Sequence, residues 1–233
     1  MLKKERQDFI LKIVTDRRYC TVAHLSQQLH VAPVTVRRDL EEMETAGLIK
    51  RCHGGAALCS HENREVPYDL RDRENTSAKA RIGKQASKLL HHGDTVFLDA
   101  STTVTHLVDY LDPAMELTVI TNSIRIQEKL RGKSIRCYLT GGMLLENSYA
   151  LVGQIAEATV SSMYADLCFF SSQGITEDGI ITDYSEDETR LRRCMIQNSA
   201  KSIFLYDKSK LGKRFLFRVC KESDLYTTIT DNQ

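Results

Sequence analysis

The stretch VAPVTVRRDLEEMETAGL, residues 31–48, decides how the chain begins to fold. Pro33 suits the first turn of a helix, because an N–H at that position would have no partner to lose. Three apolar residues then recur at helical spacing before Gly47, namely Val36, Leu40 and Met43. This pattern predicts an amphipathic helix with its opposite side in solvent.

The flanking residues predict a small module around this helix. Apolar spacing indicates a first helix around residues 9–14 and a second that Thr21 caps and that runs to Leu29. After the third helix, Leu48–Arg51 is predicted to be a strand, and Gly54-Gly55 gives the tight turn of a hairpin. Three helices and a hairpin together predict a winged helix-turn-helix.

The exposed turn of the third helix carries two arginines beside a hydroxyl. A guanidinium can bridge the O6 and N7 atoms of guanine or clamp a phosphate. We therefore expect double-stranded operator DNA as a partner, although solvated arginines on a plain three-helix module are the alternative. The residues expected to contact DNA are Thr35, Arg37 and Arg38 on the helix and Lys50, Arg51 and His53 on the wing.

The bulk composition fits two modest domains. The chain has 233 residues, 42% hydrophobic and 27% charged, with a formal net charge of +1. It has no apolar run long enough to span a membrane, and charged residues interrupt the N-terminal segment, so we expect a cytoplasmic protein without a signal peptide. Seven cysteines without a C-x-x-C pair suggest neither a disulfide framework nor a metal, and no cofactor is expected.

Beyond residue 76 the pattern changes to alternating helices and short apolar strands. This alternation predicts an α/β open sheet with helices on both faces. The expected strands are 95–99, 117–121, 135–140, 167–171, 203–206 and 226–229, and the expected helices are 103–111, 124–130, 154–163 and 186–198.

Polar residues follow several of these strands, where ligands bind in open α/β sheets. Asp99 and the hydroxyls of Ser101, Thr102 and Thr103 lie between a strand and a helix, an arrangement that favours anions. Asn122, the pair Gly141-Gly142 and the segment Asp207–Lys210 follow later strands. The combination of hydroxyls, amide, carboxylate and lysine is what a sugar phosphate needs.

The chain resembles the DeoR family of bacterial sugar-metabolism repressors over nearly its whole length. The residues Thr35 to Leu40 resemble the family signature, GLIKRCHGGA resembles its wing, and LDASTT, TNS, LTGG and DKSKLGK resemble its later motifs. Ala32 departs from the family, which usually has a capping serine there; the lost cap costs about 1 kcal/mol. Ser172 and Gln173 replace residues that include a carboxylate in many relatives, so they cannot serve as a base.

The resemblance implies a second domain that senses an effector and is related in fold to ribose-5-phosphate isomerase. The effector-binding residues it implies, including a lysine common in the family, are Lys79, Asp99, Ser101, Thr102, Thr103, Asn122, Gly141, Gly142 and Lys208. The expected domains are 1–58, which binds DNA, a linker at 59–76, and 77–233, which senses a phosphorylated sugar and forms a homodimer or homotetramer.

These observations predict a DNA-binding repressor of a carbohydrate-catabolism operon, controlled by a phosphorylated sugar and without enzymatic activity. The alternative is a sugar-phosphate isomerase that carries a DNA-binding module, with Asp99 as the strongest candidate base and Asp183 and Glu186 as weaker ones. A third reading is a second domain that only dimerises.

Overall fold

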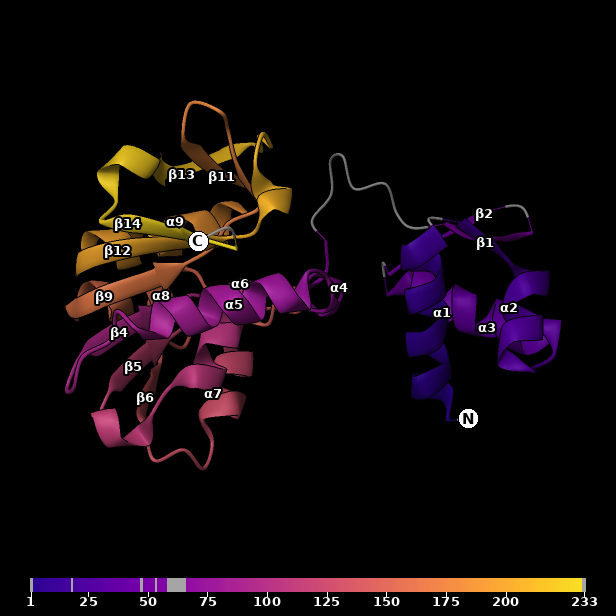
Figure 1. The fold of residues 1–233 in the computed structure, drawn as a ribbon, viewed down its shortest axis with the longest axis horizontal. Helices are drawn as coiled ribbons and strands as arrows, with labels where there is room; N and C mark the ends of the chain where they lie inside the picture. Colours follow the sequence, from indigo (N-terminus) through magenta and orange to yellow (C-terminus); the bar gives the residue numbers. More distant parts are fainter. Residues whose placement is uncertain (1, 18, 47, 53, 58–65, 232–233) are drawn as a thin grey trace. The chain divides into compact units, whose positions relative to one another are not determined.

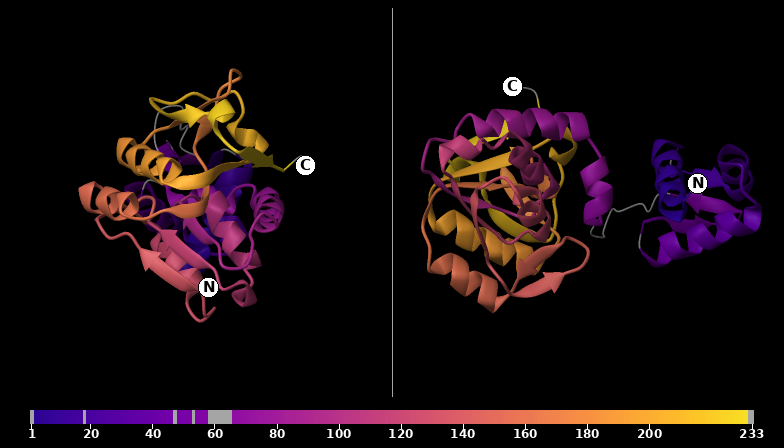
Figure 2. Two further views of the ribbon diagram at one scale, coloured as in Figure 1. Left: turned by 90° about the vertical axis from the view of Figure 1, so that its left-hand side faces the viewer. Right: turned by 90° about the horizontal axis from the view of Figure 1, so that it is seen from below.

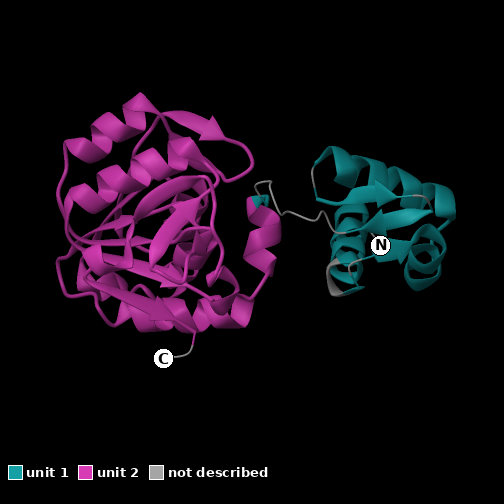
Figure 3. Cartoon of the chain, turned by 90° about the horizontal axis from the view of Figure 1, so that it is seen from above, with its two compact units in different colours: residues 1–67 teal, residues 68–233 magenta. Residues whose placement is uncertain are grey.

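The structure is a computed structural model that describes residues 2–17, 19–46, 48–52, 54–57 and 66–231 (Figure 1). The chain divides into two units, residues 1–67 and 68–233 (Figure 3). The expected boundaries at 58 and 76 stay predictions, and residues 58–65 lie outside the described part. Across the described ranges, no helix is both long and apolar enough to cross a membrane.

The first unit consists of three helices and a three-stranded antiparallel sheet in the order β1-β3-β2. Its helices are α1 (Lys3–Arg17), α2 (Val22–Leu29) and α3 (Pro33–Thr45), and its strands are β1 (Tyr19–Thr21), β2 (Lys50–Cys52) and β3 (Gly55–Ala57). The expected strand at Leu48–Arg51 starts two residues later, at Lys50. Strand β1 has no counterpart in the sequence analysis, because three residues between two helices show no period.

Local chemistry explains where these helices begin. The hydroxyl of Thr21 accepts a hydrogen bond from the His24 N–H at 3.1 Å and caps α2, as predicted. Ala32 precedes α3 without a side-chain cap, while Pro33 occupies its first turn. A nearly buried ion pair fixes α1 against α3: the Arg6 Nη2 atom donates to Asp39 Oδ1 at 3.0 Å, and its Nε to Oδ2 at 2.5 Å.

The second unit is built on a parallel six-stranded sheet in the order β14-β12-β9-β4-β5-β6. These strands are β4 (Thr95–Leu98), β5 (Thr118–Thr121), β6 (Arg136–Leu139), β9 (Ala165–Phe170), β12 (Ser199–Tyr206) and β14 (Thr227–Thr230). The predicted α/β open sheet is confirmed, with small shifts at the ends of strands.

Helices cover both faces of this sheet (Figures 1 and 2). One buried cluster joins the strand residues Val96, Leu98 and Val119 to apolar residues of three helices, α5 (Thr76–Ser87), α6 (Thr102–Leu107) and α7 (Ile124–Leu130). A second cluster joins Phe97 and Phe204 to α8 (Gln154–Ser161) and α9 (Glu186–Gln197). Alternate residues of each strand thus face opposite cores.

The remaining elements of this unit were not expected in detail. A hairpin pairs β7 (Met143–Leu145) with β8 (Ala150–Val152), and a second antiparallel sheet joins β10 (Gly174–Ile175), β11 (Ile180–Asp183) and β13 (Phe217–Lys221). The short helix α4 (Tyr68–Arg73) precedes α5. The helix expected at 103–111 is instead α6 followed by a 3-10 turn, η1 (Val108–Tyr110), and further 3-10 turns are η2 (Pro113–Met115), η3 (Lys208–Lys210) and η4 (Glu222–Asp224).

Candidate functional site

The polar residues that follow the strands gather at one edge of the six-stranded sheet. Strands β12, β9, β4 and β5 are neighbours in a parallel sheet, so their carboxyl ends lie at the same edge. The residues directly after these ends include Asp99, Asn122, Ser171 and Asp207. The expectation that separate segments meet here is therefore met by the topology.

A cavity at the start of α6, called here the α6 cavity, lies among these ends. Ser101 caps α6: its hydroxyl accepts a hydrogen bond from the Val104 N–H at 3.3 Å. The N–H groups of Thr102 and Thr103 belong to the first turn, where a helix offers donors to an anion. The residues that line the α6 cavity are Arg71, Ser101, Thr102, Thr103, Ser171, Ser172, Gln173, Asp183, Arg192 and Lys210.

Arg192 lies at the centre of a buried charge network. Its Nε donates to Asp99 Oδ2 at 2.8 Å and its Nη1 to Asp183 Oδ2 at 3.0 Å. All three side chains are at most 5% exposed, and Glu188 lies 4.0 Å away on the same helix. Burial alone would lower the pKa of Arg192, but the three carboxylates raise it above its ordinary value, so the guanidinium stays charged.

The carboxylate of Asp99 has its oxygens fully occupied. Oδ1 accepts hydrogen bonds from the Ser101 N–H at 3.1 Å and its hydroxyl at 2.5 Å. Oδ2 accepts from Arg192 and from the Ser171 N–H at 3.3 Å. Asp99 thus joins the end of β4 to that of β9 and to α9, which is a positioning role.

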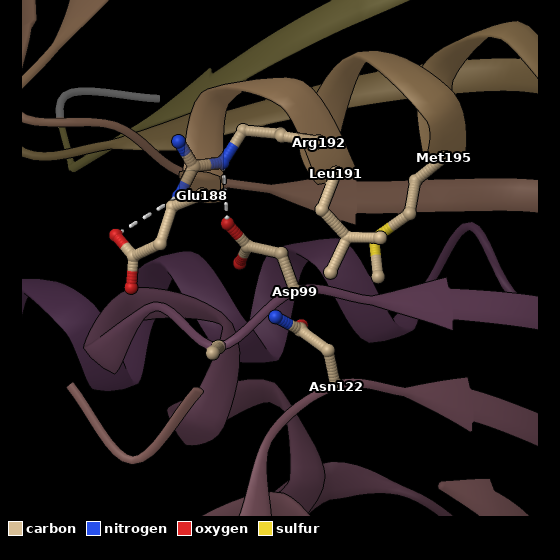
Figure 4. A pocket seen from close by; sticks show the side chains of 7 residues that line it. Asp99, Asn122, Glu188, Leu191, Arg192 and Met195 are labelled. Carbon is tan, nitrogen blue, oxygen red and sulfur yellow. Dashed lines mark hydrogen bonds and ion pairs between the residues drawn. The ribbon is translucent and has the colours of Figure 1, made fainter. Parts of the chain in front are cut away.

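A second cavity, called here the α9 cavity, lies on the other side of Arg192 (Figure 4). It is lined by Asp99, Ala100, Asn122, Glu188, Leu191, Arg192 and Met195. The Asn122 side chain is 4% exposed and donates to the Leu151 carbonyl at 3.1 Å. Its Oδ1 finds no hydrogen-bond partner among the described residues, and a buried acceptor in that state is costly. The pKa of Glu188 is raised by burial and by the charge of Asp183.

Two lysines near the α6 cavity have unusual electrostatics. The Nζ of Lys210, on the turn η3, donates to Gln173 Oε1 at 3.1 Å, and burial together with the Arg71 charge lowers its pKa to about 8. Burial lowers the pKa of Lys79 to about 8 as well, against the opposing charge of Asp207. Lys79 lies behind the cavity wall, where its ammonium donates to the carbonyl of Arg71.

Three of the expected effector residues lie outside both cavities. Lys208 is exposed, and its backbone N–H donates to Asp231 Oδ1 at 3.2 Å, so the nearby Lys210 is the lysine of this turn that reaches the α6 cavity. Gly141 and Gly142 adopt positive φ angles of +70° and +110° after β6. At Gly142 a Cβ atom would lie 2.4 Å from the Val152 carbonyl oxygen, which explains this glycine by close backbone packing.

The sequence analysis missed Arg71, Glu188 and Arg192. Arg71 falls in a charged segment that was expected to be a linker leading into a short helix. Glu188 and Arg192 do carry a signal: together with Leu191 and Met195 they form one i, i+3, i+4, i+7 stripe of α9. Two charged residues within an otherwise apolar stripe indicate a buried ion pair.

In the first unit, the expected DNA contacts lie on one side of α3 and on the wing. Arg37 and Arg38 are exposed on the side of α3 opposite its buried residues Val36 and Leu40. Lys50 is exposed in β2, and Thr35 is half-buried. The Arg51 guanidinium lies 3.6 Å from Glu41 and 3.9 Å from Glu44, so it interacts with α3. His53 lies outside the described residues.

Metal binding finds no support in the described ranges, which contain no group of three histidine, cysteine, aspartate or glutamate side chains arranged to hold an ion. Of the Cys52, His53 and Cys59 cluster weighed from the sequence, His53 and Cys59 lie outside those ranges. Cys168 is buried in the second core cluster, as expected of a small hydrophobe.

Comparison with known proteins identifies both parts of the chain. Residues 6–62 match the model of the DeoR-like helix-turn-helix domain, and residues 74–232 match that of the DeoR C terminal sensor domain. The repressor GlcR of Bacillus subtilis is 35% identical over 99% of this chain and 89% of its own length. The lactose phosphotransferase system repressor of Staphylococcus epidermidis is 32% identical over 100% of this chain and 93% of its own.

Solved structures share the fold at low sequence identity. The eIF2B delta protein of Chaetomium thermophilum is 16% identical, with a TM-score of 0.52 over 71% of this chain and 59% of its own. Ribose 5-phosphate isomerase a of Methanocaldococcus jannaschii has 16% identity and a TM-score of 0.45 over 59% of this chain and 55% of its own. Taken with the two domain matches and the full-length relatives, the chain belongs to the DeoR family of helix-turn-helix transcriptional regulators.

Proposed function

We propose that this regulator represses a carbohydrate-catabolism operon and that a phosphorylated sugar controls its affinity for operator DNA. The observation that carries the proposal is the α6 cavity, where hydroxyls, first-turn N–H groups and cations meet at the carboxyl edge of the sheet. Thr102, Thr103 and Lys210 together offer what a phosphate dianion binds: N–H and O–H donors and an ammonium.

The α9 cavity supports a sugar as the rest of the effector. Asn122 Oδ1 is a buried acceptor without a partner among the described residues, and a sugar hydroxyl would donate to it. Glu188 adds a second polar group. Because Arg192 lines both cavities, an effector with its phosphate in one and its hydroxyls in the other would lie along this guanidinium.

The DNA-binding side rests on α3 and the wing. We propose that Thr35, Arg37 and Arg38 enter the major groove and that Lys50, Arg51 and His53 contact the backbone beside it. Two copies would bind two half-sites, so the active form is a homodimer or a pair of dimers. Such a regulator acts where the chromosome is, in the cytoplasm.

The isomerase alternative receives less support from the site. Proton abstraction needs a carboxylate with a free lone pair within reach of the substrate. Both oxygens of Asp99 already accept two hydrogen bonds each, and Asp183 accepts from Arg192 and from the Ser172 hydroxyl at 2.9 Å. Glu186 is exposed. The full-length relatives reported above are transcriptional regulators, and we propose that this chain has no enzymatic activity.

The test is operator binding with and without sugar phosphates. An operator is first selected from random duplexes, and its affinity is then measured by fluorescence anisotropy with a panel of pentose, hexose and deoxyhexose phosphates. We expect one compound to change the affinity, typically 5- to 150-fold. Thr103→Val, which removes one hydroxyl at constant volume, should weaken that compound and leave bare operator affinity unchanged. Absence of sequence-selective binding at any salt concentration would overturn the proposal.

A further inference from the structure

We propose that Arg71, on the short helix α4, binds the effector phosphate and makes α4 the element through which the effector controls DNA affinity. The proposal rests on the function proposed above and deepens it by naming the residue that couples the two activities. Arg71 belongs neither to the polar residues at the strand ends nor to the motifs that first indicated an effector site.

The position of α4 in the chain is the first observation. The first unit ends at Pro67, and α4 begins at Tyr68, the first residue of the second unit. A displacement of α4 therefore moves the point from which the chain continues toward the DNA-binding unit. The strand ends that form the rest of the α6 cavity have no such direct connection.

The location of the Arg71 side chain is the second observation. It is 8% exposed and lines the α6 cavity with Ser101–Thr103 and Lys210, although these residues are distant in sequence. A guanidinium presents a planar fork of donors that matches two phosphate oxygens. The buried ammonium of Lys79 donates to the Arg71 carbonyl and so holds the backbone of α4 at this residue.

The narrowness of the α6 cavity is the third observation, since it leaves room for little more than a water molecule. A sugar phosphate therefore has to move part of the wall. The strand ends resist movement, because Asp99 and Asp183 are tied together by Arg192 within the core. Helix α4 has only six residues and packs on α6 at the surface, so it is the wall that can move most easily.

Separate polar contacts hold α4 in its present position. The Tyr68 hydroxyl donates to Thr105 Oγ1 on α6 at 2.9 Å, and its N–H donates to the Asn147 carbonyl at 2.8 Å. Asp72 lies 3.6 Å from the His106 imidazole on α6. A pull on Arg71 by the phosphate would act against these few contacts, which define one of two positions for the helix.

The experiment compares two charge-removing variants that line the same cavity. Arg71→Met and Lys210→Met are made in the full chain, and the sugar phosphate that acts on the wild type is titrated by calorimetry to find its saturating concentration. Operator affinity is then measured without and with that concentration. Lys210→Met should need at least tenfold more compound, yet show the full wild-type change in operator affinity at saturation. Arg71→Met should bind with a similar loss, but its operator affinity should change less than twofold.

A full change of operator affinity in saturated Arg71→Met would overturn the inference. Arg71→Lys, which keeps the charge without the fork, carries the test if Arg71→Met does not saturate, and should show a partial change; a full change there would also overturn the inference. Amide hydrogen exchange over Tyr68–Arg73 should respond to the compound in the wild type and in Lys210→Met, and an unaltered wild-type pattern at saturation contradicts the proposal. A wild type that no sugar phosphate affects defeats the proposed function itself, which keeps the two failures distinguishable.

Discussion

The Arg192 Nε atom donates a hydrogen bond to Asp99 Oδ2 at 2.8 Å, and both side chains are at most 5% exposed. This contact joins α9 to the end of β4, and Asp183 extends the network to β11 at 3.0 Å. A buried guanidinium between two buried carboxylates is costly to break, since removing it leaves uncompensated charges in the core.

We predict that Arg192→Met destabilises the second unit by about 3–5 kcal/mol, which lowers its melting temperature by about 10 °C. Arg190→Met on the same helix is the matched control, because Arg190 forms an exposed pair with Glu157 at 3.3 Å, worth less than about 1 kcal/mol. Thermal unfolding followed by circular dichroism measures both. Equal melting temperatures for the two variants would contradict the structural role of Arg192.

The affinity for the sugar phosphate should depend on pH through Lys210. The pKa of this lysine is lowered to about 8 by burial, and only its protonated form attracts the phosphate. Affinity should therefore be highest between the second phosphate pKa, about 6, and pH 8, and should fall as the pH rises through 8. In Lys210→Met the fall above pH 8 should be much reduced, whereas Lys208→Met, at the exposed lysine, should behave as the wild type. Calorimetric titrations from pH 6 to 9.5 decide the point, and an undiminished fall in Lys210→Met would assign it to another group.

Arg37 and Arg51 should contribute differently to operator binding. Arg37 is exposed on α3, and a bidentate contact to guanine contributes about 1–3 kcal/mol, so Arg37→Ala should weaken the operator roughly 5- to 150-fold and relax selection at one base pair. Arg51 interacts with Glu41 and Glu44, and Arg51→Ala should mainly reduce the salt dependence, by about one unit of slope. Anisotropy titrations on wild-type and single-base-substituted operators measure both effects. Uniform weakening on every sequence for Arg37→Ala would mean that it contacts only phosphate.

Gly142→Ala should destabilise the second unit, although the expected role of this glycine was effector contact. The added Cβ atom would lie 2.4 Å from the Val152 carbonyl oxygen, and the φ angle of +110° is strained for alanine. Gly212→Ala is the control, since its φ is +70° and its Cβ would meet no atom within 4 Å, so only the backbone strain of about 1–2 kcal/mol applies. Urea denaturation should show the larger loss for Gly142→Ala. A loss no greater than the control's would restore the case for a ligand-contact role.

The sequence predicted the regular core of the fold well and its irregular parts poorly. The helix at 124–130 agrees with α7, and the helix at 186–198 differs from α9 by one residue, because both follow a clear apolar period. Strands β10, β11 and β13 were not expected. They are two to five residues long, and their pairing joins distant segments, such as Thr182 with Arg218. Such pairing depends on the tertiary fold rather than on local pattern.

The candidate site divides in the same way. Ser101–Thr103 and Asn122 follow strands, and the topological rule for open sheets was enough to bring them together. The segment Asp207–Lys210 offered two lysines, and only the 3-10 turn shows that Lys210 faces the α6 cavity while Lys208 faces solvent. Arg71 comes from a charged segment without periodicity, so its burial could be found only from the packing of α4.

The most direct measurement is a reciprocal one, in which the affinity for the sugar phosphate is determined by calorimetry with and without saturating operator DNA. Coupling between two binding sites is thermodynamically reciprocal. If the compound weakens operator binding by a given factor, operator DNA must weaken binding of the compound by that same factor, within error. We predict equal factors of at least fivefold. An affinity for the sugar phosphate that operator DNA leaves unchanged would contradict control of DNA binding from the α6 cavity.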